Sequence, residues 1–495
     1  MDPQVAASLA ELERKLDALE RTLSGLTAAT GAAAEPGHAA APAVPAQAPP
    51  VAADAPSWGR IIDESAEGRD EIASFAPPAP STPAPAQTVA APPRRAPPGP
   101  AELLRFRERL EAVTRDLADD YDALLGRLSY PAMPSTPSST ISFARGVPSL
   151  DIIDVTGLRD AAVRAFDSDP EGTTAYGTSV GYPRLRAWIA DRHGVEPECV
   201  LVTNGSLQAD AFLFDQLVGS GSEVVVERPT YDRTLLGLKE RGAIVHAIAL
   251  EHDGIDTSAL GGLLAGGARP KLAHVIPNFQ NPAGYTLSLA KRRELLSLAA
   301  AHDFLILEDD PYADLRFSGE PQPTMLSLDP ARVVYASSFT KTVCPGVRVG
   351  YLVGPRDLIA GIARRATNTY ISPGMVSEAI VYEFCASGAL ERSIETVRAA
   401  LAERAAALAS ALRRDLPVAE FVEPQGGYFM WVTLPPGTSV DALFDAAAAR
   451  GVAFVKGTDF MTDGGENEFR LAYSGVTVEQ VDEGVARLAE AYRSL

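Results

Sequence analysis

A lysine in a polar turn has neighbours that indicate chemistry. The segment SSFTKTVCPGVRVGY covers residues 337–351 and begins at the end of a predicted strand. Ser338 lies three positions before Lys341, and Arg348 lies seven positions after it, behind a Pro-Gly turn. A serine hydroxyl and a guanidinium together make a good phosphate site. The spacing therefore predicts that Lys341 forms a Schiff base with a phosphorylated aldehyde cofactor.

Other short motifs lie before and after this segment, and some have a physical interpretation of their own. Gly205 and Ser206 fall between a predicted strand and a helix start, where backbone amides bind phosphate. The same residues also suit an ordinary helix cap. The motifs read, in chain order, SFARGVPS, TAYGTSVGYPRLR, VTNGSLQA, ERPTYDR, PNFQNPAG, ILEDDPYADLRF and NEFRLAYS.

Together with the lysine segment, this ordered set resembles fold-type I pyridoxal-phosphate enzymes, specifically class I/II aminotransferases. It is most similar to 2-aminoadipate-type aminotransferases and to the aminotransferase half of MocR-type regulators, over residues 141–495. The resemblance implies transfer of an amino group between an L-amino acid and a 2-oxo acid. It implies pyridoxal 5'-phosphate as cofactor and Lys341 and Asp309 as catalytic residues. The regulators carry a basic winged helix ahead of this body, which this sequence does not match.

The resemblance also assigns the residues that hold the cofactor ring. Tyr231 is similar to the aromatic residue that stacks on the pyridine ring of the cofactor. Asn281 and Tyr312 are similar to the groups that hydrogen-bond the phenolic oxygen of the cofactor. Asp309 matches the carboxylate that pairs with the pyridine nitrogen, because Tyr312 follows three positions later. Glu308 and Asp310 are rival acids in the same run. The full implied cofactor set is Tyr176, Gly205, Ser206, Leu207, Tyr231, Asn281, Asp309, Tyr312, Ser338, Lys341 and Arg348.

Substrate and subunit contacts follow from the same resemblance. Arg470 matches the arginine that grips the substrate α-carboxylate, and its planar fork suits a bidentate pair. Gly146 and Asn281 complete the implied substrate site. Tyr176 resembles the tyrosine that a neighbouring subunit contributes to the phosphate site, so we expect a homodimer. Thr340 and Leu207 depart from the common serine and glutamine of the family, without removing a required group.

The elements that must position these residues are predicted from about residue 141 on. Short apolar runs alternate there with helical patterns, which predicts an α/β fold with a mostly parallel sheet covered by helices. We expect a large cofactor-binding domain over 141–385 and a smaller α/β domain over 386–495. The predicted strand runs lie at 200–203, 223–227, 244–250, 272–277, 304–309, 333–338 and 350–354.

The preceding part of the chain has a different composition. Leucines spaced three and four apart from Leu9 to Leu26 predict a short coiled-coil helix over 1–30. Residues 31–100 form a predicted disordered linker, because 16 of the 39 prolines fall there with many alanines. Residues 57–75 inside it are either a docking motif or a chance apolar patch. A helical pattern and lead-in cover 101–140.

Composition excludes several classes of protein. The 44 basic and 64 acidic residues give a net charge of −20, which argues against nucleic acid and anionic membranes as partners. Three scattered cysteines and six histidines show no metal-ligand spacing, so no metal is expected. Sparse cysteine fits a reducing compartment, and no secretory signal is seen, so we expect a cytoplasmic protein.

The same sequence features also allow functions other than amino transfer. The same residues would serve another reaction of the cofactor, such as that of a lyase, cyclase, decarboxylase or oxidase in a specialised pathway. A non-enzymatic scaffold or effector-sensing protein is a further alternative, which the complete set of catalytic groups disfavours. A nicotinamide-dependent dehydrogenase is poorly supported, because GSGSEV at 219–224 lacks the third glycine and precedes a strand. A protein partner could bind the N-terminal helix or residues 57–75.

Overall fold

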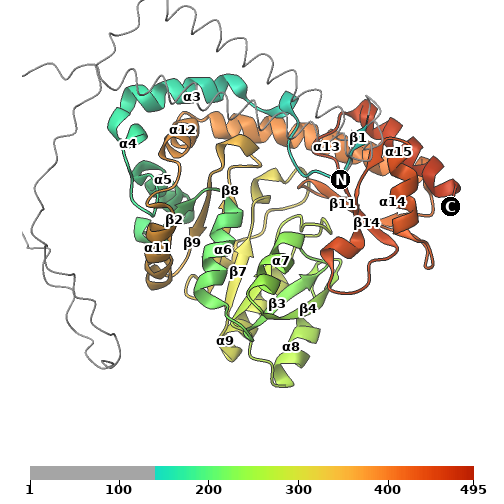
Figure 1. Cartoon of the computed structure of the whole chain (residues 1–495), viewed down its shortest axis with the longest axis horizontal. Helices are drawn as coiled ribbons and strands as arrows, with labels where there is room; N and C mark the ends of the chain where they lie inside the picture. The colour runs from blue at the N-terminus through green and yellow to red at the C-terminus, as the bar shows by residue number, and fades with distance from the viewer. Residues whose placement is uncertain (1–139) are drawn as a thin grey trace, which may run out of the picture. The chain divides into compact units, whose positions relative to one another are not determined.

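The computed structural model describes residues 140–495 (Figure 1). The predicted coiled-coil helix over 1–30, the linker over 31–100 with its segment 57–75, and all but the last residue of the lead-in over 101–140 lie outside the described residues. These remain predictions. Among residues 140–495, no helix combines the length and apolar character needed to cross a membrane.

An eight-stranded sheet forms the centre of the large domain, in the order β2-β9-β8-β7-β6-β3-β4-β5. The five strands from β8 to β4 in that order run parallel to one another, whereas β2, β9 and β5 pair antiparallel. The expected mostly parallel α/β sheet is therefore confirmed. The strands are β2 (Val200–Thr203), β3 (Glu223–Arg228), β4 (Ile244–Glu251), β5 (Gly254–Ile255), β6 (Leu272–Val275), β7 (Leu305–Asp309), β8 (Val333–Ser338) and β9 (Gly350–Val353).

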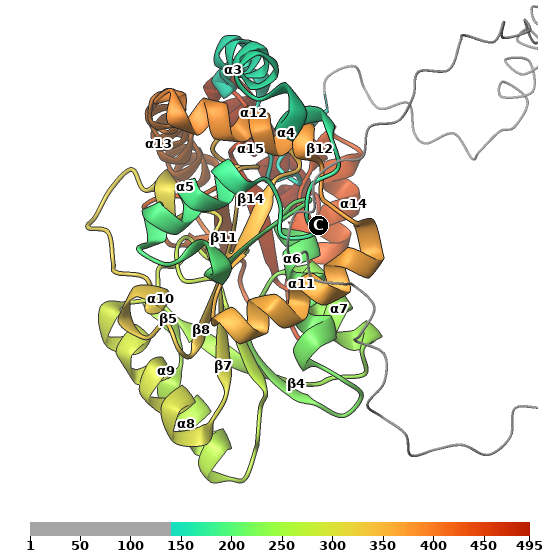
Figure 2. The same cartoon turned by 90° about the vertical axis from the view of Figure 1, so that its left-hand side faces the viewer.

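Alternation along the strands supplies a separate apolar core on each face of this sheet. Val225 belongs to one buried cluster, and its neighbours Val224 and Val226 belong to the other. The first face is covered by α5 (Pro183–His193), α8 (Thr257–Ala265), α9 (Leu289–His302) and α12 (Met375–Ala386). The second is covered by α6 (Ser206–Leu217), α7 (Asp232–Glu240) and α11 (Arg356–Tyr370). Figure 2 shows α9 and α6 on opposite sides of β7 and β8.

The smaller C-terminal part contains a four-stranded antiparallel sheet in the order β10-β11-β14-β13. Its strands are β10 (Glu420–Phe421), β11 (Phe429–Thr433), β13 (Val455–Lys456) and β14 (Glu468–Ala472). Its helices, which lie with it at one side of Figure 1, are α13 (Ala389–Asp415), α14 (Val440–Ala448) and α15 (Val478–Arg493). The helices α3 (Val155–Ser168), α4 (Pro170–Thr174) and α10 (Met325–Leu328) belong to the preceding part of the chain.

The first described strand pairs with this C-terminal part. β1 (Ile141–Ser142) lies parallel to β12 (Val452–Ala453), and Phe143 is buried in the C-terminal apolar core. The sequence prediction grouped residues from 141 on with the large domain, whereas the structure packs this first segment against the C-terminal sheet. The segment that follows Phe143 is thereby held beside the ends of the large-sheet strands.

Candidate active site

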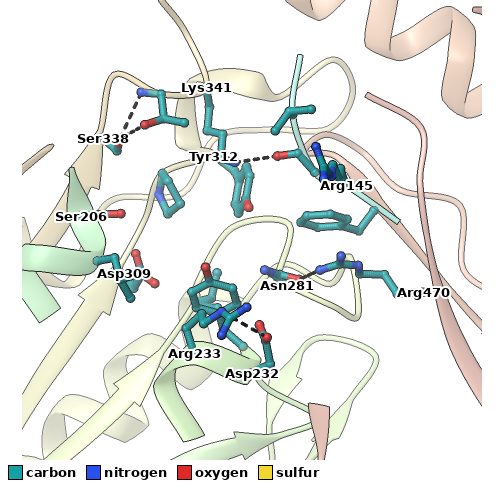
Figure 3. A pocket seen from close by; sticks show the side chains of 18 of the residues that line it. Arg145, Ser206, Asp232, Arg233, Asn281, Asp309, Tyr312, Ser338, Lys341 and Arg470 are labelled. Carbon is teal, nitrogen blue, oxygen red and sulfur yellow. Dashed lines mark hydrogen bonds and ion pairs between the residues drawn. The ribbon is translucent and has the colours of Figure 1, made fainter. Parts of the chain in front are cut away.

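A cavity of about 490 Å³ lies at the carboxyl ends of β7 and β8. Parallel strands end at the same edge of a sheet, so Asp309 at the end of β7 and Ser338 at the end of β8 both reach this cavity. Figure 3 shows the residues around it. The predicted site residues that line it are Gly146, Ser206, Leu207, Tyr231, Asn281, Asp309, Tyr312, Ser338, Lys341, Arg348 and Arg470.

Two predicted site residues do not line this cavity. Gly205 precedes the lining residue Ser206 as the N-cap of α6, so it still belongs to the wall of the site. Tyr176 is 85% exposed and stands away from the cavity of its own chain. Its expected contribution to another subunit's site stays a prediction.

The start of α6 forms one end of the cavity. Gly205 has φ +88°, and a Cβ there would lie 2.3 Å from Nη2 of Arg348. A Cβ on Gly350 would lie 2.3 Å from the backbone nitrogen of Ser206. The two glycines therefore let backbone and guanidinium come together at a helix N-terminus, whose first amides have no intrahelical partner. This arrangement suits a phosphate.

Ser338 and Arg348 complete that end. The Ser338 Oγ accepts the backbone N–H of Thr340 at 3.0 Å and lies 2.7 Å from the Thr340 hydroxyl. Arg348 adopts a left-handed backbone with φ +50°, which is uncommon for a residue other than glycine. Its Nη2 donates to the Asn204 carbonyl at 3.4 Å. Both side chains line the cavity beside the start of α6.

The geometry separates the three acids that the sequence left as rivals. Glu308 accepts the backbone amides of Met325 and Leu326 at 2.8 and 2.9 Å, and Asp310 accepts the amide of Asn278 at 2.9 and 3.0 Å. Side chains alternate along a strand, so Asp309 points the other way and lines the cavity.

Asp309 has an unused acceptor inside the protein. The carboxylate is only 5% exposed, and its Oδ2 lies 3.4 Å from Nε2 of His274. Its Oδ1 is buried without a hydrogen-bond partner among the described residues. A buried acceptor without a donor is costly. The position fits a ligand that brings a positively charged N–H, such as a protonated ring nitrogen.

Lys341 lies between this carboxylate and the substrate side of the cavity. Its Nζ donates to the Gly146 carbonyl at 2.8 Å and lies 5.7 and 5.1 Å from the ring centres of Tyr312 and Tyr428. Burial, with a further contribution from the nearby Arg470 guanidinium, lowers the pKa of Lys341 to about 8. The neutral, nucleophilic form of the amine is therefore much more populated near neutral pH than in an exposed lysine, whose pKa is about 10.4.

Arg470 in β14 is held on the opposite side from Asp309. Its Nη1 donates to Oδ1 of Asn281 and its Nη2 to the Ala144 carbonyl, both at 2.7 Å. Its guanidinium carbon lies 4.2 Å from the ring centre of Phe429. Burial lowers the pKa of Arg470 to about 10, so the guanidinium remains charged at neutral pH. A fixed, charged fork of this kind suits a carboxylate.

Several lining residues were not predicted from the sequence. Arg145, Asp232 and Arg233 add charge to the cavity wall, and Phe429 adds an aromatic face. Arg145 directly precedes Gly146, and the Asp232–Arg233 pair directly follows Tyr231, so adjacency to a motif was an available signal. Phe429 had no such signal, because only the pairing of β11 with β14 brings it beside Arg470.

These features fit a cofactor with a phosphate, an aldehyde and a protonated ring nitrogen. Residues 140–495 contain no group of three or more His, Cys, Asp or Glu residues that could hold a metal ion. Residues 139–488 match the family model of class I and II aminotransferases. The chain belongs to this family. It is a pyridoxal-phosphate-dependent aminotransferase that acts on amino acids and 2-oxo acids, as the resemblance implied.

Individual relatives agree with the family match. The 2-aminoadipate transaminase of Thermus thermophilus is 33% identical, over 72% of this chain and 90% of that protein. Aromatic-amino-acid aminotransferase 1 of Thermococcus litoralis is 30% identical, over 79% and 98%. The crystal structure of α-aminoadipate aminotransferase from Thermus thermophilus, complexed with N-(5'-phosphopyridoxyl)-L-leucine, has a TM-score of 0.69 and 32% identity over 72% and 92%.

Proposed function

We propose that this aminotransferase works through Lys341, Asp309 and Arg470, with the start of α6 as its phosphate site. The proposal is carried by Asp309, which lines the same cavity as Lys341 and whose buried Oδ1 has no hydrogen-bond partner among the described residues. Pyridoxal phosphate supplies an aldehyde that bonds to amines and a ring that accepts electrons when its nitrogen is protonated. The following roles belong to the residues of this chain.

Asp309 keeps the ring nitrogen protonated. Its carboxylate is desolvated, so its attraction for a cationic N–H is stronger than it would be in water. His274 lies 3.4 Å from Oδ2, which leaves Oδ1 as the acceptor without a partner among the described residues. Tyr231, Asn281 and Tyr312 border the same space and would orient the ring and its phenolic oxygen.

The phosphate is held by backbone amides and two side chains. The amides of Ser206 and Leu207, at the first positions of α6, would donate to its oxygens. The Ser338 hydroxyl and the Arg348 guanidinium would add a neutral and a charged donor. The Gly205 backbone allows Arg348 to approach this point.

Lys341 holds the cofactor aldehyde covalently and, once released, moves the proton. An amine with a pKa near 8 accepts and returns a proton readily at neutral pH, which general acid–base catalysis requires. Its position 2.8 Å from the Gly146 carbonyl puts it beside the backbone that borders the substrate. Lys341 would therefore carry a proton from the substrate α-carbon and return it to the cofactor carbon.

Arg470, Asn281 and Gly146 orient the substrate. Arg470 binds the α-carboxylate, and Asn281 fixes the guanidinium through the 2.7 Å hydrogen bond from Nη1. A Cβ on Gly146 would lie 2.4 Å from the Phe429 ring, so the backbone lies against that ring and leaves room for the carboxylate. The α-carbon is thereby directed toward Lys341.

A homodimer and a cytoplasmic location belong to the same proposal. Tyr176 is exposed at 85% and is free to reach the phosphate of a second copy, as the resemblance implies. The three cysteines Cys199, Cys344 and Cys385 are free thiols, which is compatible with a reducing compartment. The helix predicted over residues 1–30 and the segment 57–75 remain candidates for self-association or for binding another protein.

The test is an absorbance screen of the purified, cofactor-loaded enzyme. Each amino acid of a panel is added alone, and conversion of the aldehyde form of the cofactor to its amine form is followed. A 2-oxo acid is then added to restore the aldehyde form. The proposal predicts both half-reactions in the native enzyme and neither in Lys341→Ala. Release of carbon dioxide, or a product without the amine form, would contradict amino transfer.

A further inference from the structure

A buried acid lies outside the cavity but is hydrogen-bonded to a loop that lines it. Glu227, near the end of β3, and Gln280, in the loop after β6, are each 1% exposed, and neither lines the cavity. The Nε2 of Gln280 donates to Oε2 of Glu227 at 3.0 Å. The proposed function gives this pair no role, although Asn281 directly follows Gln280 and lines the cavity.

The side-chain amide of Gln280 joins two loops. Its Nε2 also donates to the Pro229 carbonyl at 2.8 Å, and its Oε1 accepts the backbone N–H of Ala283 at 2.7 Å. Pro229 lies two residues before Tyr231, which borders the space for the cofactor ring. Both N–H groups and the oxygen of this buried amide are therefore engaged, so its position and orientation are fixed.

Glu227 holds this amide from the sheet. Its Oε2 also accepts the backbone N–H of Ile276 at 3.1 Å, so one carboxyl oxygen holds the first residue after β6 as well as Gln280. Burial raises the pKa of Glu227 to about 8, against the lowering effect of these two hydrogen bonds. The neutral acid therefore predominates near neutral pH, and its contribution depends on the acceptor oxygen and not on a negative charge.

The position of Gln280 is transmitted to the substrate end through its neighbour. The Oδ1 of Asn281 accepts Nη1 of Arg470 at 2.7 Å, as Figure 3 shows. The rest of the fork is held by the Ala144 carbonyl, which accepts Nη2. A shift of the loop that carries Asn281 therefore turns the guanidinium, and a misplacement of about 1 Å in an active site can cost about 100-fold.

We propose that Glu227 is a positioning residue for substrate binding, which orients Arg470 through Gln280 and Asn281. The proposal rests on the proposed role of Arg470 in binding the α-carboxylate. Without the acceptor on Glu227, the Gln280 amide loses one partner and the Ile276 N–H is left buried without one. The loop then moves to recover these hydrogen bonds, and substrate affinity falls. The groups at the ends of β7 and β8 keep their places, so the chemistry changes little.

The test compares Glu227→Leu with Glu227→Gln in the cofactor-loaded enzyme. Leucine has no acceptor, whereas glutamine keeps one and matches the neutral acid. Single-turnover absorbance with the fastest amino acid of the panel gives a dissociation constant and a limiting rate. Glu227→Leu should weaken binding about tenfold or more and change the limiting rate less than about threefold, and Glu227→Gln should change each less than about threefold. The α-methyl analogue of that amino acid, which binds but has no α-hydrogen to lose, checks the dissociation constant.

A double-variant cycle tests whether Glu227 acts through Gln280. Gln280→Leu alone should weaken binding by a similar factor, and the double variant should be within about threefold of the weaker single variant, because both changes break the same chain of contacts. Glu223→Leu is the matched control. Glu223 begins the same strand, but its Oε2 lies 2.7 Å from Nε2 of His246, so this variant should change binding less than about twofold.

The proposal is overturned if Glu227→Leu binds the amino acid as tightly as the native enzyme, if its limiting rate falls as much as its affinity, or if the two single effects multiply in the double variant. Should Glu227→Leu fail to fold, Gln280→Leu decides the matter, since native affinity in that variant also overturns the proposal. These outcomes differ from failure of the proposed function, in which the native enzyme would convert no amino acid to the amine form. They also differ from failure of the Arg470 role, in which Arg470→Gln would bind the amino acid normally.

Discussion

The cofactor end and the substrate end of this active site are built in different ways. The cofactor end uses the ends of β7 and β8 and the start of α6, which all belong to the large sheet and its covering helices. The substrate end combines residues 144–147, 429 and 470, which meet because β11 pairs with β14 and the segment after β1 crosses them. One end follows from local rules of α/β sheets, and the other from pairing between distant segments.

The charged side chains at the two ends also differ in how deeply they are buried. Asp309 is buried, and its Oδ1 has no hydrogen-bond partner among the described residues, so it suits a single kind of partner. Arg145, at the substrate end, is exposed on the cavity wall, and its side chain makes no hydrogen bond or ion pair within residues 140–495. We infer that the first end determines the reaction, and the second determines which molecule undergoes it.

The largest expected effect is at the cofactor end. Asp309→Ala removes the carboxylate that keeps the ring nitrogen protonated, and should lower kcat by about 10³-fold, or ~4 kcal/mol of barrier. Steady-state kinetics of the cofactor-saturated variant measures this. Asp310→Asn is the matched control, because Asp310 faces Asn278 and not the cavity. If Asp310→Asn lowered kcat as much as Asp309→Ala does, the distinction between the two acids would be wrong.

A smaller effect is expected at the substrate end. Arg470→Gln removes the charged fork beside Asn281, and should raise KM for the amino acid by about 10- to 100-fold, since hydrogen bonds to charged groups contribute about 1.5 to 3 kcal/mol. Cofactor absorbance should stay close to native, because Arg470 lies on the opposite side from Asp309. Loss of cofactor with an unchanged KM would show that Arg470 serves the cofactor end, which would contradict this assignment.

The smallest expected effect is a shift in the pH dependence of Lys341, which lies between the two ends. Its pKa is lowered to about 8 by burial first and by Arg470 second. Only the neutral amine attacks an aldehyde, so the rate at which cofactor-free enzyme binds pyridoxal phosphate covalently should rise with pH and level off above about 8. Stopped-flow absorbance measures the profile. In Arg470→Gln the midpoint should move to higher pH, and a shift to lower pH would contradict this cause.

The sequence predicted the cofactor end more completely than the substrate end. One short segment contains Ser338, Lys341 and Arg348, and the run 306–309 places Asp309 at a strand end. Residues that are close in the sequence are therefore also close in the fold here. Each apolar run proposed as a large-sheet strand forms one. Such features are local, which is why one sequence suffices to predict them.

The substrate end was predicted only in part. Gly146 and Arg470 were assigned by resemblance, whereas Arg145, Asp232, Arg233 and Phe429 were not predicted. The placement of Arg145 and Phe429 depends on the parallel pairing of β1 with β12 and on the antiparallel pairing of β11 with β14, whereas Asp232 and Arg233 begin α7 directly after Tyr231. Pairing between segments some 300 residues apart leaves no local pattern in the sequence. The grouping of residues 141–143 with the large domain differs from the structure for the same reason.

The central claim is that Lys341 holds the cofactor. The direct measurement is reduction of the cofactor-loaded enzyme with borohydride, which converts the lysine–cofactor bond into a stable amine, followed by digestion and mass spectrometry of the peptides. The account predicts one cofactor-modified peptide, with the added mass on Lys341, and none at that position in Lys341→Arg. A modified lysine elsewhere in the chain, with Lys341 unmodified, would contradict it.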